Sequence, residues 1–283
     1  SKATKLISIG NQAFQNAASL ATVKLPATVT SIGNQAFQGT TSLSSLTVPN
    51  SLTSIGDRAF LASGLTSLDL SSTQVTTIGQ GAFANTTALK TLTVPSTLTT
   101  LNSTGSGSYG DDTSATFFGS ALESLDLSST QITSIADYTF SGAAKLATVK
   151  LPAGVTSIGN KAFYGTTELK TLTQVDKGEN GKLNDKITTI GNYAFAKTGL
   201  ATIDLKDTKI IGEGSGTSLG NSVFLQATSL NSLTLPNGLT TIPAGMVAGA
   251  TALKTLTIPT TVTKINDGNS DNPGAFQGSG LTS

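Results

Sequence analysis

The side chains that most often carry out catalysis are missing from this sequence. Its 283 residues include no histidine and no cysteine. Without histidine there is no Ser-His-Asp or Cys-His arrangement, and without cysteine there is no disulfide, thiolate nucleophile or thiolate metal site. We therefore expect no catalytic residue, no cofactor and no metal centre, and we predict that the chain is not an enzyme.

Acidic side chains in stretches rich in glycine and asparagine are the remaining candidates for metal chemistry. Oxygen-rich loops of this kind suit a hard cation such as calcium. No stretch has the spacing of an EF-hand loop or of a calcium-binding nonapeptide repeat, so we interpret the carboxylates as charges that keep loops soluble. The same stretches also contain candidates for partner binding: Tyr109, Asp111, Asp112, Asp267 and Asp271.

The low charge of the chain excludes other classes of partner. Charged residues make up 12% of the sequence and the net charge is +1, so there is no basic patch for nucleic acid or for an anionic membrane surface. No apolar run approaches the ~20 residues that cross a bilayer. We expect a protein that binds no nucleic acid and has no membrane span in this segment.

A phenylalanine that returns every 23 residues organises the chain. Such a period is typical of a solenoid, in which stacked repeats bury a continuous core that no single repeat could form. Four insertions of 11, 9, 6 and 6 residues interrupt the period, within 102–115, 174–186, 211–218 and 266–274. The recurring residues are Phe14, Phe37, Phe60, Phe83, Phe117, Phe140, Phe163, Phe195, Phe224 and Phe276, with Val247 where another is due.

Each repeat predicts three local elements, as residues 20–43 illustrate. Apolar residues at 20, 23 and 25 predict a main strand, which Pro26 ends because proline donates no hydrogen bond. Val29 and Ile32 predict a second short extended segment. Asn34 is expected to cap one helical or 3-10 turn that carries Phe37 into the core.

Two variants of the repeat occur. The commoner variant has proline after the main strand, whereas the other has aspartate within it, at 65–75, 122–132 and 200–210. In the aspartate variant a residue is missing at one corner and an extra residue follows at the next. The period stays at 23, so both variants stack in one register.

These residues resemble the BspA-like branch of the leucine-rich repeat family, through the motif LxxLxLPxxVTxIGxxAFxGxxxL from Leu6 to Leu281. The resemblance implies an α/β solenoid, a right-handed leucine-rich repeat stack of about eleven turns, with a parallel β-sheet on one face and short helical or 3-10 turns opposite. Residues 1–283 would form a single domain. The chain starts and stops partway through a repeat, so we expect a segment of a longer protein.

The resemblance also implies a function, since family members are commonly secreted or surface-anchored bacterial proteins, several of them thought to be adhesins. The family has no shared catalytic residues. We expect an extracellular or cell-surface location, with signal peptide and anchor outside this segment, and a monomer that binds a protein or glycan on a host or bacterial surface. The alternatives are a structural spacer that projects other domains from the envelope and, less favoured, an enzyme whose catalytic domain lies outside the segment.

Three parts of the surface are candidates for binding. The first is the most varied column of the main strands, which lacks aromatic anchors and so predicts weak, multivalent binding, or else a merely solvated sheet. The second is the set of insertions, of which we expect three to emerge at one corner. The third, two columns of serine and threonine, suits exposed strands better than an ice-binding plane. The charged members of the first column are Lys24, Asp69, Asp126, Lys150 and Asp204.

Overall fold

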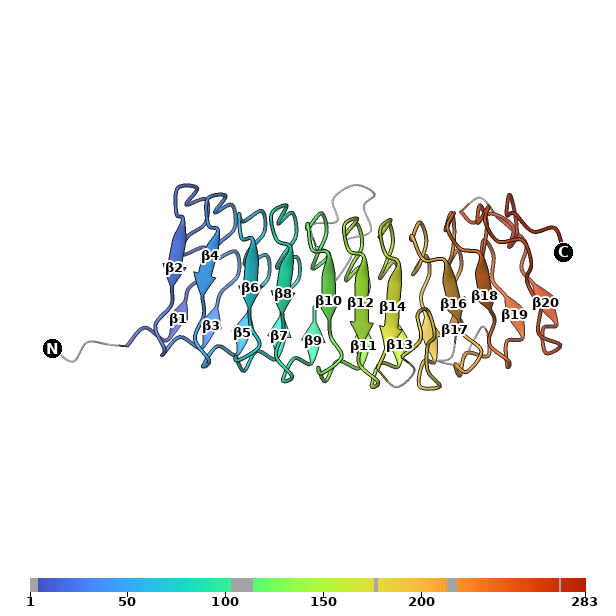
Figure 1. The fold of residues 1–283 in the computed structure, drawn as a ribbon, viewed down its shortest axis with the longest axis horizontal. Helices are drawn as coiled ribbons and strands as arrows, with labels where there is room; N and C mark the ends of the chain where they lie inside the picture. Colours follow the sequence, from blue (N-terminus) through green and yellow to red (C-terminus); the bar gives the residue numbers. More distant parts are fainter. Residues whose placement is uncertain (1–4, 103–113, 176–177, 213–217, 270) are drawn as a thin grey trace.

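The computed structural model describes residues 5–102, 114–175, 178–212, 218–269 and 271–283. These residues form an elongated stack of repeats, with the N-terminus at one end and the C-terminus at the other (Figure 1). Every strand lies across the long axis and pairs in parallel with the equivalent strand of a neighbouring repeat. The predicted leucine-rich repeat solenoid is confirmed.

Two sets of strands alternate along the chain. The main strands are β2 (Thr22–Lys24), β4 (Ser45–Thr47), β6 (Ser67–Asp69), β8 (Thr91–Thr93), β10 (Ser124–Asp126), β12 (Thr148–Leu151), β14 (Thr171–Gln174), β16 (Thr202–Asp204) and β18 (Ser232–Thr234). The second strands are β1 (Ser8–Ile9), β3 (Ser31–Ile32), β5 (Ser54–Ile55), β7 (Thr77–Ile78), β9 (Thr100–Leu101), β11 (Ser134–Ile135), β13 (Ser157–Ile158), β15 (Thr189–Ile190), β17 (Ser218–Leu219), β19 (Thr241–Ile242) and β20 (Lys264–Ile265).

The second strands form sheets of their own, so parallel strands are not confined to one face as predicted. They pair in the orders β1-β3-β5-β7-β9, β11-β13-β15-β17 and β19-β20. The pairing is in register, for example Ile158 opposite Ile190. The breaks between these sheets fall after β9 and after β17, next to two of the insertions.

The segment that carries phenylalanine is not helical, which corrects the predicted helical or 3-10 turn. We call this segment, residues 34–39 and its equivalents, the phenylalanine turn. Its amides alternate between two partners: Gln35, Phe37 and Gly39 donate to carbonyl oxygens of the next repeat at 2.8 Å, whereas the amide of Gln38 donates within its own turn at 3.1 Å. A helix would direct all of these amides along its own axis.

Left-handed backbone at two positions makes this alternation possible. The residues two before and two after phenylalanine have positive φ in most repeats, for example 56° at Gln35 and 68° at Gly39. Glycine adopts this conformation without strain, which explains why it recurs at the second position. Where glycine occupies this position, it shapes the turn for stacking.

Asparagine and aspartate three residues before phenylalanine bond to the next repeat instead of capping a helix. The Asn34 Oδ1 atom accepts from the Asp57 amide at 2.9 Å, and the Asn192 Oδ1 atom accepts from the Asn221 amide at 2.7 Å. We call these side chains the asparagine ladder. It comprises Asn11, Asn34, Asp57, Asp137, Asn160 and Asn192.

The phenylalanines stack in one uninterrupted column from Phe14 to Phe224. Ring centroids are 5.0 Å apart between Phe14 and Phe37 and 5.8 Å apart between Phe195 and Phe224, and the most tilted pair is inclined by 20°. Every ring from Phe37 to Phe224 is buried. Because each ring between Phe14 and Phe224 stacks on two others, the column links neighbouring repeats through the core.

The nine-residue insertion contributes an extra strand-like segment to the main sheet. The Gly181 amide donates to the Leu172 carbonyl oxygen at 2.7 Å, and the Leu183 amide donates to the Asp204 carbonyl oxygen at 3.1 Å. The segment thus lies between β14 and β16, and Leu183 is fully buried. Within this segment, Lys182 forms a parallel β-bridge with Asp204 of β16. The insertion therefore continues the stack.

The other insertions do not share one corner, contrary to the prediction for three of them. The insertions within 102–115 and 266–274 follow a second strand, whereas the one within 211–218 precedes β17. The structure therefore divides them between the two ends of a second strand.

Candidate partner-binding surface

The predicted charged column lies on the main strands as expected. Asp126 pairs with Lys150 in register, and their charged groups are 3.0 Å apart. Both side chains remain about half exposed, at 51% and 53%. Lys24 lies opposite Thr47, and Asp204 lies opposite Thr234. Within the charged column, the structure brings Asp126 and Lys150 together in an ion pair.

The three aspartates of this column hold the corner that follows their own strand. A side-chain oxygen of each accepts from the amide two residues later, at 2.9 Å, with Ser71, Ser128 and Lys206 as donors. This contact explains the aspartate variant of the repeat, because it forms the corner that proline forms in the other variant. Asp69, Asp126 and Asp204 therefore have a structural role.

Hydrogen bonds alter the acidity of two of these aspartates. The Thr93 hydroxyl and the Ser71 amide lower the pKa of the Asp69 carboxyl below its ordinary value. Burial raises the pKa of Asp126, but hydrogen bonds from Ser128 and the nearby Lys150 ammonium outweigh it and leave the pKa lowered. Both carboxylates are thus stabilised in the charged form by contacts within the protein.

The threonine column of the second strands is also engaged with the backbone. The Thr53 hydroxyl donates to the Thr30 carbonyl oxygen at 2.8 Å, and Thr99 donates to Thr76 at 3.0 Å. Hydroxyls committed in this way stabilise the stack and are not presented to an external lattice of water. The geometry favours the structural interpretation of this column.

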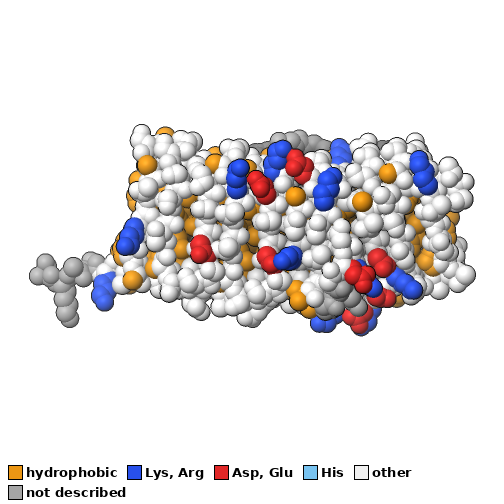
Figure 2. Space-filling model, viewed as in Figure 1, with side chains coloured by type: hydrophobic (Ala, Val, Ile, Leu, Met, Phe, Trp, Pro, Cys, Tyr) orange, Lys and Arg blue, Asp and Glu red, His pale blue; other side chains and the backbone are white. Residues whose placement is uncertain are grey.

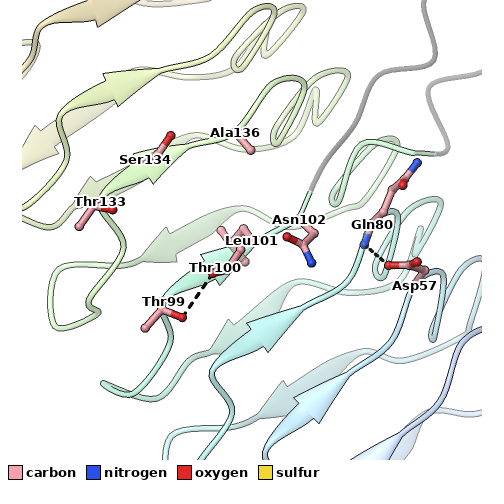
Figure 3. A pocket seen from close by; sticks show the side chains of 9 residues that line it. All are labelled: Asp57, Gln80, Thr99, Thr100, Leu101, Asn102, Thr133, Ser134 and Ala136. Carbon is pink, nitrogen blue, oxygen red and sulfur yellow. Dashed lines mark hydrogen bonds between the residues drawn. The ribbon is translucent and has the colours of Figure 1, made fainter.

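Four hollows formed by described residues all lie on the side of the second strands and the phenylalanine turns, away from the charged column. The largest of the four, about 490 Å³, opens at the break after β9, and Figure 3 shows its side chains. It is lined by Asp57, Gln80, Thr99, Thr100, Leu101, Asn102, Thr133, Ser134 and Ala136.

A longer groove runs beside β11, β13, β15 and β17. It has a volume of about 370 Å³ and we call it the second-strand groove. Hydroxyl side chains from successive repeats line it, together with part of the asparagine ladder. These residues are Ser134, Ser157, Thr189 and Ser218, with Asp137, Asn160 and Asn192.

Tyrosine and lysine side chains gather at the edge of this groove. The Lys161 Nζ atom lies 5.2 Å from the ring centroid of Tyr138, 5.7 Å from that of Tyr164 and 5.9 Å from that of Tyr193. The Lys197 Nζ atom lies 5.2 Å from the Tyr164 ring. These are cation–π distances, and the three rings are half-buried. We call these five residues the tyrosine–lysine cluster.

The fold does not require these side chains. Tyr138, Lys161 and Tyr193 occupy the left-handed position two before phenylalanine, where φ is 60°, 51° and 56°. Gly81 and Gly245 occupy the same position elsewhere. Because glycine suffices for the backbone, and a side chain costs some strain there, the rings are not needed to form the turn.

The C-terminal insertion reaches this cluster. The Tyr193 hydroxyl donates to the Asn272 Oδ1 atom at 3.0 Å and to the Asp271 carbonyl oxygen at 3.2 Å. Asp271 thus lies beside the cluster, whereas Asp267 is an exposed residue of the same insertion. The predicted candidates Tyr109, Asp111 and Asp112 lie outside the described residues.

Other classes of site find little support in the part of the chain that the structure describes. Among those residues, no three acidic side chains gather as metal ligands would. No helix of bilayer-spanning length and hydropathy occurs there either. On the face shown in Figure 2, charged side chains are sparse toward the N-terminal end, and acidic and basic side chains gather together at the lower right.

Sequence reasoning missed the tyrosine–lysine cluster, although its signal was present. The prediction of weak binding considered only the main strands, which lack aromatic residues, whereas Tyr138, Tyr164 and Tyr193 lie in the phenylalanine turns. The useful signal was the position two before phenylalanine, occupied by Tyr138, Lys161 and Tyr193 in successive repeats. Neighbouring repeats bring such residues to one edge.

Comparisons with known proteins agree with this architecture. The model of the BspA type leucine rich repeat region matches in six copies, over residues 3–105, 113–180 and 174–279. A leucine-rich repeat protein from Bacteroides ovatus is 20% identical, with a TM-score of 0.51, and the match covers 96% of this chain and 80% of that one.

A second leucine-rich repeat protein, from Eubacterium ventriosum, is 23% identical with a TM-score of 0.48, and the match covers 98% of this chain and 81% of that one. No curated protein sequence matches the chain. The family match spans most of the sequence and coincides with the stacked repeats. This chain therefore belongs to the BspA-type leucine-rich repeat family.

Proposed function

We propose that this chain is a non-catalytic interaction module of a secreted or surface-anchored bacterial protein, and that it mediates adhesion to a host or bacterial partner. The family is generally non-catalytic, and its repeats suit protein interaction. The observation that carries the proposal is the tyrosine–lysine cluster. Half-buried aromatic side chains beside a groove are typical anchors of binding surfaces, and this fold does not need them.

The charged column of the main strands has a weaker claim. Its aspartates are engaged in their own corners, and Lys150 is paired with Asp126. Exposed ion pairs of this kind contribute little binding energy. Lys24, and the loop residues Asp267 and Asp271, remain candidates for the rim of an interface.

A structural spacer is the second candidate function. The column of stacked rings from Phe14 to Phe224 supports it, since a continuous core makes a stiff rod. A spacer needs only this inner column, whereas a binding module needs the surface residues as well. The two candidates therefore differ in what the outer side chains do.

Binding to purified partners separates them. The purified chain is immobilised and exposed to a panel of purified extracellular matrix proteins and surface glycans, and retention is measured by surface plasmon resonance. An interaction module retains a defined partner at micromolar concentrations, and the double substitution Tyr138→Asn and Tyr193→Asn reduces that retention. A chain that retains no member of a broad panel is a spacer.

A further inference from the structure

The second-strand groove presents one hydroxyl group from each of four successive repeats. Ser134 lies opposite Ser157, Ser157 opposite Thr189, and Thr189 opposite Ser218. Strand spacing places the backbones of these residues about 4.8 Å apart along the stack. The Ser157 hydroxyl donates to the Ser134 hydroxyl at 2.9 Å, so these two groups form a hydrogen-bonded pair. A row of hydroxyl-bearing residues along the groove suits a ligand that itself repeats hydroxyl groups along its length.

Glycine keeps the groove open beside these hydroxyls. Gly159, Gly191 and Gly220 lie between the second strands and the asparagine ladder, and all three line the groove. A side chain at Gly191 would meet the Asn160 amide nitrogen at 2.5 Å, so packing alone forbids one. The same residue type that allows the repeats to stack thus leaves a channel along the surface.

The backbone of the two inner strands of the groove is not available for a peptide strand. β13 pairs with β11 on one side and β15 on the other, and β15 also pairs with β17. Strand addition requires an unpaired sheet edge, which these inner strands lack. A ligand that lies along β13 and β15 must therefore bind through side chains.

The cluster at the groove's edge offers apolar ring surface with fixed orientation. Tyr138, Lys161 and Tyr193 also line a hollow of about 310 Å³ with Asp137, Asn160 and Asn192. The Lys161 ammonium near three rings limits their freedom, which reduces the entropy lost on binding. Sugar rings have apolar faces and polar rims, so they suit aromatic faces flanked by amide, hydroxyl and carboxylate groups.

The charges in the groove and hollow balance each other. Asp137 and Lys161 are the charged residues that line them, one of each sign. Lys197 contacts Tyr164 at the far edge and lines neither space. A polyanion would meet Asp137 and a polycation would meet Lys161, whereas an uncharged polymer meets neither penalty.

We propose, resting on the interaction function above, that the second-strand groove and the tyrosine–lysine cluster bind a neutral glycan chain that lies along the stack. The sugar hydroxyls bond to the row from Ser134 to Ser218, and sugar rings pack on Tyr138 and Tyr193. The contact of Asn272 with the Tyr193 hydroxyl limits the site at its C-terminal end.

Tyrosine fluorescence tests this site directly, because the chain has four tyrosines and no tryptophan. Tyr109→Phe leaves only the tyrosines of the cluster as reporters. This variant is titrated with neutral hexasaccharides of glucose, mannose, galactose, xylose and N-acetylglucosamine. At least one is expected to change the emission in a saturable manner, and calorimetry then gives its affinity.

Two pairs of variants locate the binding. Tyr138→Asn with Tyr193→Asn should weaken it at least tenfold, whereas Gln35→Asn, at the same position of an N-terminal repeat, should leave it unchanged. Asparagine suits both positions because it tolerates left-handed backbone. Ser157→Arg fills the groove and should abolish binding, whereas Ser54→Arg, in the equivalent place on β5, should not.

The proposal is overturned if no neutral hexasaccharide changes the emission, or if the tyrosine and Ser157 variants bind as well as the parent. Preference for a sulfated chain, with affinity that falls steeply with salt, would also overturn it in favour of an anionic ligand. If the immobilised chain still retains a purified protein, the interaction function survives the failure of the glycan proposal.

Discussion

The two sides of the stack use polar and aromatic residues in opposite ways. On the main strands, aspartates are engaged in corner contacts, and Asp126 lies 3.0 Å from Lys150. On the side of the phenylalanine turns, Tyr138 and Tyr193 stand where glycine would serve the backbone as well. A charged residue on a repeat surface can therefore be part of the scaffold. A bulky residue in a strained backbone position is a better indication of a binding site.

Removal of one phenylalanine should have the largest effect, because the column supports both sides. Phe163 is fully buried, with rings at 5.0 Å and 5.3 Å on its two sides. Phe163→Ala should lower the free energy of unfolding by about 3–5 kcal/mol, measured by chemical denaturation. Phe276→Ala is the matched control, since Phe276 is only half-buried and should cost less than half as much. Equal losses of unfolding free energy at the two sites would show that stacking within the column does not contribute the stability that we assign to it.

Replacement of a glycine that directly precedes the asparagine ladder should give the next largest loss of stability. The disturbance should be confined to the side of the phenylalanine turns. A Cβ atom at Gly191 would lie 2.5 Å from the Asn160 amide nitrogen and 2.7 Å from the Gly159 carbonyl carbon. Backbone must move to admit it, so Gly191→Ala should cost about 1–3 kcal/mol.

Ala136 offers the control for this change. It occupies the equivalent position directly after the break between β9 and β11, where it lines the largest of the four hollows. Ala136→Gly should therefore change the unfolding midpoint only slightly. A large loss there, or none in Gly191→Ala, would contradict the packing explanation for these glycines.

Much of the fold could be predicted from the sequence because the repeat constrains it. The period of Phe14, Phe37 and Phe60 predicts the stack, and the alternation of Val23 and Leu25 predicts the main strands. The phenylalanine turn was predicted wrongly, since one sequence does not reveal that its amides bond to the next repeat. Asn34 has the same identity as a helix cap, and only the neighbouring repeat shows its actual partner, the amide of Asp57.

The candidate site was harder to predict for a related reason. Asp69 and Asp126 look like free surface charges in a strand pattern, yet their partners are amides two residues later. The nine-residue insertion looks like a loop, yet the burial of Leu183 makes it part of the sheet. Local sequence gives the identity of each column, whereas the contacts between columns depend on how the repeats stack.

Loss of one side chain of the asparagine ladder should lower the free energy of unfolding by a smaller amount, and it tests whether this ladder stabilises the side of the phenylalanine turns. Asn192→Ala removes the acceptor for the Asn221 amide, now at 2.7 Å, and should cost about 1 kcal/mol by chemical denaturation. Asn192→Asp keeps an acceptor oxygen, as Asp57 and Asp137 do in other repeats, and should keep most of the stability. If both variants lose the same amount, the side chain acts through something other than this hydrogen bond.

The corner contact of Asp69 should give the smallest effect, and pH reveals it. The Thr93 hydroxyl and the Ser71 amide lower the pKa of Asp69 in the folded protein below its ordinary value. Its contribution to stability is therefore present above the unfolded pKa and is lost as pH falls through the folded pKa. Because Asp69 is exposed, we expect only about 0.5 kcal/mol or less between neutral pH and this acidic range.

A carbon-detected NMR titration measures this pKa directly. Thr93→Val removes the largest cause of the shift and should raise the pKa of Asp69 toward its ordinary value. The control is Thr47→Val, on the neighbouring strand β4, because Thr47 is not among the causes of the shift; this variant should leave the pKa of Asp69 unchanged. The comparison between the two sides depends on this outcome. If Thr93→Val leaves the pKa of Asp69 unchanged, the carboxylate does not depend on this hydrogen bond. The charged column would then again be a strong candidate for partner binding.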